Sequence, residues 1–266
     1  MDSHKIHITP VTRNRLFGLP IFDKELLSFI EEYGLVFNMK NGHYYYKGDG
    51  EMKADSRIVR KDKCGFKISF GSPFPSDFNC ERLGLVSLVG APEEVEGGFY
   101  CGGNRLASLY GAPKYVGGLF DCNNNGLKSL AHAPETVGDF DCSLNLLTSL
   151  IGSPKEVNSY FKCNNNLLES LEGSPSEIHG YFHCQDNQLH SLKGAPNTVE
   201  WEFRCDNNLL LTLDGAPNYV GLDFNCSGNR LTSLQYAPYE IGGRLVCKDN
   251  NIAILVEEMA MYRIIY

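Results

Sequence analysis

The sequence predicts a mainly β fold, a solenoid of nine coils of about 21 residues whose short strands form a parallel sheet. Nine of the ten cysteines recur 21 residues apart, with one step of 20. Each lies in the same pattern, F-x-C-x-x-N-x-L-x-S-L-x-G-A-P-x-x-V-x-G-x. A fixed period of roughly 20 to 29 residues is typical of a solenoid. The repeating cysteines are Cys80, Cys101, Cys122, Cys142, Cys163, Cys184, Cys205, Cys226 and Cys247.

The Phe-x-Cys segment predicts one short strand per coil. Side chains alternate across a strand, so Phe and Cys point inward together while their neighbours point outward. Stacked coils place these strands side by side, about 4.8 Å apart. A small cysteine behaves there as a buried hydrophobe, which indicates packing and reduced thiols rather than disulfides.

Asparagine and proline define the rest of each coil. The turn after the strand hides backbone groups that need partners, and one asparagine per coil is expected to supply them. Leucines fill the core, and a proline keeps the returning segment extended and free of helix. The asparagines are Asn104, Asn125, Asn145, Asn166, Asn187, Asn208, Asn229 and Asn250. The prolines are Pro92, Pro113, Pro134, Pro154, Pro175, Pro196, Pro217 and Pro238.

The two ends lack the period. Residues 1–64 are predicted to hold a helix, capped by Asp23 and ended by Gly34, and then strands and hairpins. This segment is either a cap on the open end of the solenoid or a small interaction module. The solenoid is expected over residues 65–257 and a C-terminal cap over 258–266, with self-association through this end as an alternative. The predicted apolar face of the helix is Leu26, Leu27, Ile30 and Tyr33.

The repeat resembles a known family. F-x-C-x-x-N-x-L-x-S-L is similar to the L-x-L-x-x-N-x-L-x-x-L segment of leucine-rich repeat proteins, with Phe and Cys replacing two leucines. The short return with proline resembles the recognition domains of bacterial type III secreted effectors. The Cys- and Asn-rich repeats resemble arrays common in phage-encoded proteins. These resemblances imply a parallel sheet on the concave face, outward strand positions that contact a partner, and a protein that binds other proteins.

Charge and hydropathy exclude some function classes. The net charge is −8, whereas nucleic-acid binding needs clustered Lys and Arg to neutralise phosphates. The chain shows neither an apolar run long enough to span a bilayer nor a signal-peptide core at its start. We therefore expect a cytoplasmic protein with no nucleic-acid or membrane partner. If the protein is phage-encoded, the cytoplasm is that of the host.

The outward strand positions predict the candidate binding residues. The residue between Phe and Cys and the residue before Phe form two neighbouring groups, with two large apolar residues at one rim. The acidic patch is Asp121, Asp139 and Asp141. The aromatic–basic patch is Tyr160, Lys162, Tyr181, His183 and Arg204. The rim pair is Trp201 and Leu222.

Like charges on neighbouring strands are unfavourable, and Lys162, His183 and Arg204 are predicted to be vertical neighbours. A merely solvated face is the alternative explanation of such a row. The acidic residues that are candidates to compensate it are Glu202, Asp206 and Asp186.

No catalytic site is predicted. Neither carboxylate of the acidic patch has a companion acid or base, and nearby histidines fall at different phases of the repeat. No cofactor or metal is therefore expected. The sequence predicts a non-enzymatic scaffold that binds a protein, of which the most specific form is a phage or bacterial inhibitor of a host protein, such as a defence factor. The alternatives are the recognition module of a secreted effector and a self-assembling structural protein. A homo-oligomer stays open.

Overall fold

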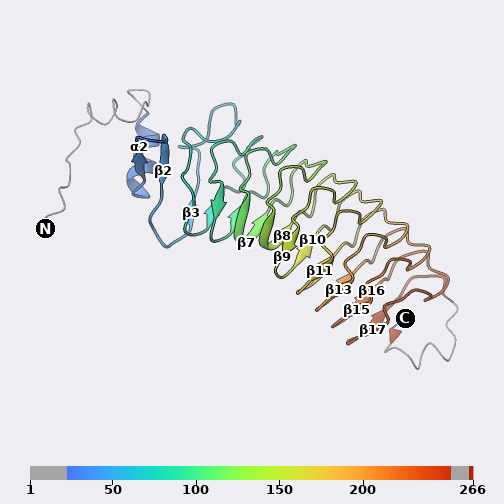
Figure 1. Cartoon of the computed structure of the whole chain (residues 1–266). Coiled ribbons are helices and arrows are strands. Elements are labelled where there is room, and N and C mark those ends of the chain that lie inside the picture. The colour runs from blue at the N-terminus through green and yellow to red at the C-terminus, as the bar shows by residue number, and fades with distance from the viewer. Residues whose placement is uncertain (1–22, 253–263, 266) are drawn as a thin grey trace, which may run out of the picture.

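The computed structural model describes residues 23–252 and 264–265. Figure 1 shows successive coils stacked in one continuous array, with the strands of neighbouring coils side by side. One parallel sheet runs along the array, so the predicted parallel β-solenoid is confirmed. Its path is β3 (Met52–Lys53), β4 (Phe78–Asn79), β6 (Phe99–Tyr100), β7 (Tyr115–Asp121), β8 (Thr136–Asp141), β10 (Phe161–Lys162), β12 (Phe182–His183), β14 (Phe203–Arg204), β16 (Phe224–Asn225), β18 (Leu245–Val246) and β19 (Ile264–Ile265).

A second line of strands follows the proline of each coil. The segment after the proline is extended, as predicted. In most coils its last residues also pair with the next coil, which the repeat pattern did not indicate. β7 and β8 are long enough to take part in both lines, so the two lines join there. The additional strands are β5 (Glu94–Val95), β9 (Glu156–Val157), β11 (Glu177–Ile178), β13 (Thr198–Val199), β15 (Tyr219–Val220) and β17 (Glu240–Ile241).

The core consists of the fixed apolar positions of the repeat. The Phe and the two Leu side chains of the inner coils are buried, and neighbouring Phe rings stack, as Phe99 and Phe120 do at 5.7 Å. All ten cysteines are free thiols, and the nine of the repeat are buried. Burial raises the pKa of thiols such as Cys163, because a thiolate loses its hydration there. The cysteines therefore act as small core residues, as predicted.

The asparagines form a ladder that joins each coil to the one before it. Asn166 Oδ1 accepts a hydrogen bond from the Leu147 backbone N–H at 3.0 Å. Its Nδ2 donates to the Cys142 carbonyl of the preceding coil at 3.0 Å and to the Cys163 carbonyl of its own coil at 3.1 Å. Because the same contacts recur from Asn104 to Asn250, one side chain per coil satisfies backbone groups that the turns bury.

Helix α2 (Lys24–Glu32) has both of its predicted ends. Asp23 Oδ1 accepts from the Leu26 N–H, and Gly34 takes a φ of +58°. The N–H groups of Gly34 and Leu35 return to the last turn, which is the Schellman arrangement. Of the four predicted positions, Leu26 and Ile30 are buried, together with Phe29, which was not predicted. Leu27 and Tyr33 are only partly buried, and Tyr33 packs against the core.

The N-terminal segment packs against the first coils. Strands β1 (Val36–Asn38) and β2 (His43–Tyr45) form an antiparallel hairpin, and Figure 1 shows α2 beside it. Tyr46, just after β2, stacks on Phe74 at 5.2 Å. The Lys67 ammonium lies 2.9 Å from an Asp23 carboxylate oxygen. β3 pairs with β4, so the parallel sheet starts inside residues 1–64.

At the other end, β19 pairs in parallel with β18. The remainder of the predicted cap over 258–266 lies outside the described residues. Within the described part of the chain, no helix has the length and apolar character that crossing a membrane requires.

Candidate protein-binding surface

In each coil of the main sheet three side chains face outward: the residue before Phe, the residue after Phe and the residue after Cys. Equivalent residues of successive coils line up, so these positions form three parallel columns along the sheet. Strand pairing places the residues after Phe in one register, so the predicted vertical neighbours are confirmed. Asp141, Lys162, His183 and Arg204 are consecutive Cα partners, and Asp121 precedes them. The acidic patch and the aromatic–basic patch therefore lie next to each other on one face.

The aromatic side chains of the aromatic–basic patch form a stack. The rings of Tyr160 and Tyr181 are nearly parallel, with centroids 4.7 Å apart. The His183 imidazole stacks against Tyr181 at 4.3 Å. The Lys162 ammonium lies 4.9 Å from the Tyr160 ring centroid and 5.5 Å from that of Tyr181, which is cation–π distance. These contacts hold the four side chains in one arrangement before any partner is present.

The predicted rim pair lies beside this stack. Trp201 is 49% exposed, and its ring centroid is 6.4 Å from that of Tyr181. Leu222 follows in the next coil, where its N–H donates to the Trp201 carbonyl, and it is also exposed. Two large apolar side chains thus extend the aromatic surface toward one edge of the sheet.

Charge compensation in the aromatic–basic patch is incomplete. Arg204 makes two hydrogen bonds to the Asp206 carboxylate, both 2.9 Å long. Asp186 accepts a hydrogen bond from Asn207, and its charge contributes to the raised pKa of Arg204 less than that of Asp206 does. Lys162 has a longer contact, 3.8 Å to Asp141.

His183 is the uncompensated member of the row. Its Nε2 is buried and has no hydrogen bond, and the nearest carboxylate oxygen, on Glu202, is 3.6 Å away. Burial, Arg204 and Lys162 lower the pKa of His183 to about 4. The imidazole is therefore neutral at pH 7, in part because it lies between two cations.

The acidic patch is more deeply buried than a solvated acidic face. Asp121 is 8% exposed, and Asp141 is similarly buried. Asp121 accepts from the backbone N–H and side-chain amide of Asn123. Asp139 accepts from the Tyr160 N–H at 3.1 Å, which connects the two patches. Burial and the neighbouring Asp141 charge raise the pKa of Asp121 to about 6, despite the hydrogen bonds from Asn123.

Asp121→Asn is expected to raise the free energy of unfolding at pH 7 by about 2 kcal/mol, because an ionised carboxylate with a raised pKa costs stability. The folded pKa of about 6 lies above the ordinary 3.8, so protons bind preferentially to the folded state between these values. The gain therefore shrinks as the pH falls from 6 toward 4. Urea unfolding at pH 7 and pH 4.5 measures both quantities. An equal gain at the two pH values contradicts the assignment.

The structure adds three exposed leucines that the sequence analysis did not select. Leu144, Leu146 and Leu167, here called the leucine ridge, lie on the loops that follow β8 and β10. Leu144 has a φ of +55° and is 51% exposed. Left-handed backbone is unfavourable for leucine, and the equivalent residues Asn124 and Asn165 are types that tolerate it. The signal was visible in the sequence as "SLN" where neighbouring coils read "NNN".

Leu144→Asn is expected to stabilise the fold by about 1 kcal/mol, because asparagine adopts left-handed backbone at lower cost. The same change is expected to weaken binding of a partner that contacts the leucine ridge. Chemical unfolding and partner titration measure the two effects. Leu167→Asn is the control, since Leu167 is exposed but lacks the positive φ, and it should not stabilise. A gain in stability from both substitutions contradicts the strain argument.

The described residues include no group of three His, Cys, Asp or Glu side chains placed to hold a metal ion. His179, near His183 in sequence, pairs with Glu200 at 2.8 Å and is exposed. The arrangement offers aromatic area, paired charges and hydrogen-bond groups, which are the components of a binding surface.

Comparison with known proteins adds little to this description. No protein-family model matches the chain, and no curated protein matches it. The solved structure of YopM from Yersinia enterocolitica WA-314 is similar, with 19% sequence identity and a TM-score of 0.40. The match covers 76% of this chain and 56% of that chain, so this chain spans little more than half of that structure. By its own strand pairing the chain is a parallel β-solenoid, a class whose extended surfaces suit protein binding.

Proposed function

We propose that the protein is a non-enzymatic scaffold that binds another protein through the outward face of its main sheet, with the aromatic–basic patch at the centre. The observation that carries this proposal is the stack of Tyr160, Tyr181 and His183 with the Lys162 ammonium over its rings. Tyrosine, tryptophan and arginine dominate the energetics of protein interfaces. Trp201 and Arg204 complete this composition within two neighbouring coils.

Pre-organisation supports the same function. A partner that docks on loose side chains loses about 0.5–1.5 kcal/mol for each one it immobilises. Tyr160 and Tyr181 are already held against each other, and Arg204 is held by Asp206, so this loss is reduced. The acidic patch lies on the neighbouring coils and would enlarge the footprint beyond the stack.

The more specific form of the proposal is a cytoplasmic inhibitor of a host protein, bound on the concave side of the array. It rests on the likeness of the Cys- and Asn-rich repeats to phage-encoded arrays. The net charge of −8 favours a protein partner over nucleic acid. A discrete higher oligomer by light scattering would instead favour the structural alternative.

The test uses tagged protein to recover partners from a bacterial lysate. A variant with Tyr160, Lys162, His183 and Arg204 changed to Ala is expected to lose the partner that the wild type captures. A matched control changes Tyr115, Lys155, His190 and Arg230 to Ala, which removes the same residue types from exposed positions off the stack. Both variants are first shown to be folded. Equal capture by all three proteins would refute the proposed surface.

We also propose that residues 1–64 act as a cap on the first coils. Their contacts through β3, Tyr46 and the Asp23–Lys67 ion pair support this role. Deleting the segment is expected to lower the melting temperature of the remaining array. A truncated array that melts like the full chain but no longer binds the partner would indicate an interaction module instead.

A further inference from the structure

We propose, on the basis of the function proposed above, that the aromatic–basic patch holds a carboxylate of the partner protein, from an aspartate or glutamate side chain. The carboxylate would lie against His183, with Lys162 and Arg204 on either side. Such a contact deepens the proposed function, because it names the chemistry that the surface selects.

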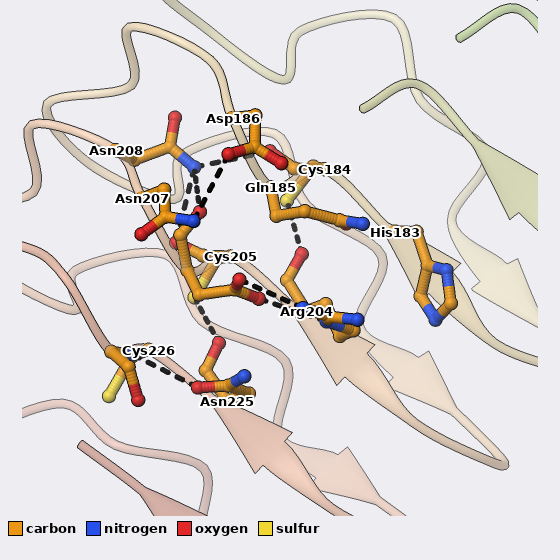
Figure 2. Close-up of polar contacts among 12 residues, drawn as sticks. His183, Cys184, Gln185, Asp186, Arg204, Cys205, Asn207, Asn208, Asn225 and Cys226 are labelled. Atoms are coloured by element: carbon orange, nitrogen blue, oxygen red, sulfur yellow. Dashed lines mark hydrogen bonds and ion pairs between the residues drawn. The ribbon is translucent and has the colours of Figure 1, made fainter. Parts of the chain in front are cut away.

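The first argument is the unsatisfied hydrogen-bonding capacity of this part of the sheet. His183 Nε2 is buried without a hydrogen bond. Figure 2 shows the His183 ring beside Arg204, which is joined to a carboxylate. Buried polar atoms without partners are rare and mark places where a ligand or water completes the structure.

The second argument is the sign of the charge around the His183 imidazole. Lys162 faces it from β10 and Arg204 from β14, while Glu202 and Asp206 flank Arg204 in sequence. Arg204 is neutralised by Asp206 at 2.9 Å, whereas the nearest carboxylate to Lys162 is 3.8 Å away. Burial is the largest cause that lowers the pKa of His183, and the charges of Arg204 and Lys162 lower it further, whereas the Asp206 charge opposes them. An anion that touches the imidazole between these two cations would be stabilised by both.

The chain's own Glu202 does not fill this place. Its carboxylate oxygens lie 3.6 Å from His183 Nε2 and 4.0 Å from Arg204 Nε, beyond hydrogen-bonding distance. Burial raises the pKa of Glu202, which shows that these contacts do not stabilise its charge fully. A partner carboxylate closer to His183 would form the hydrogen bond to Nε2 that Glu202 is too far away to form. The net charge of −8 opposes this only weakly at physiological salt, where screening acts over about 8 Å.

The contact has a defined pH dependence. A carboxylate bound at His183 favours the imidazolium and therefore raises the pKa of His183 above its free value of about 4. By linkage, binding tightens only as the pH falls through the raised pKa toward the free value, and protonation of the ligand carboxylate near pH ~4 ends this gain. The exposed His179, paired with Glu200, is an internal control because the ligand does not touch it.

The experiment measures the pKa of every histidine by NMR in the full-length protein, with and without N-acetylglutamate N-methylamide, at matched ionic strength. The pKa of His183 is expected to rise by about 1 unit with the blocked glutamate, while that of His179 stays unchanged. Lys162→Gln should abolish the rise. Glu202→Gln, which removes the competing carboxylate, should reduce the probe concentration needed several-fold.

Three outcomes overturn the proposal: no change at His183, the same change in the Lys162→Gln variant, or a response to inorganic phosphate with none to the blocked glutamate. Capture of a protein partner by the wild type together with an unresponsive His183 would leave the binding function standing and remove only the carboxylate contact. The two proposals therefore fail separately.

Discussion

Asn166→Ala is expected to lower the free energy of unfolding by about 4 kcal/mol, since each buried group left without a partner costs about 1–3 kcal/mol. The Asn166 side chain makes three hydrogen bonds of 3.0–3.1 Å, to the backbone of Leu147, Cys142 and Cys163. Two of these residues belong to the preceding coil, so the substitution leaves backbone groups of two coils without partners. Urea unfolding followed by circular dichroism measures the loss.

The matched control is Asn164→Ala, the same substitution two residues earlier on the same turn. Asn164 is only partly buried, and its side chain supplies none of the ladder contacts. Its replacement is expected to change stability by less than about 0.5 kcal/mol, as surface substitutions usually do. If the two variants unfold at the same urea concentration, the asparagine ladder does not hold the coils together.

Tyr181→Ala is expected to weaken partner binding about 100-fold, or roughly 2.7 kcal/mol. Tyr181 stacks on Tyr160 and His183, lies beside Trp201, and has the Lys162 ammonium above its ring. Removing this ring therefore frees the side chains around it as well as deleting its own contact area. Calorimetric titration with the captured partner measures the change.

Two control variants test whether the Tyr181 ring itself is required. One removes only the Tyr181 hydroxyl, and the other removes a different tyrosine. Tyr181→Phe keeps the stack and is expected to retain binding within about threefold, because only a hydroxyl is lost. Tyr115→Ala removes another exposed tyrosine, off the stack, and should leave affinity unchanged. Wild-type affinity in Tyr181→Ala would exclude the stack as the centre of the interface.

Some features of this face and its turns cost stability. Asp121 is a buried carboxylate with a raised pKa, the buried His183 Nε2 has no hydrogen bond, and Leu144 has left-handed backbone. Left-handed backbone also occurs elsewhere in the described chain, as at His132 and Tyr236. Local features that oppose stability are expected where a protein is shaped for another molecule.

Much of the fold was determined by the sequence alone. The 21-residue period, the inward Phe and Cys, the asparagine ladder and the register of Lys162, His183 and Arg204 all follow from one repeated pattern. A solenoid is unusually easy to predict from sequence, because each coil contacts chiefly its neighbours and identical positions must stack. Strand alternation then decides which side chains point outward.

Other properties were decided only by the tertiary structure. The ring stack of Tyr160, Tyr181 and His183 depends on rotamers that neighbouring coils impose on one another. The neutral His183 and the raised pKa of Asp121 depend on how much water each side chain loses, which no spacing in the sequence specifies. The repeat pattern places residues on a face, whereas burial and contacts across the coils determine their charge and orientation.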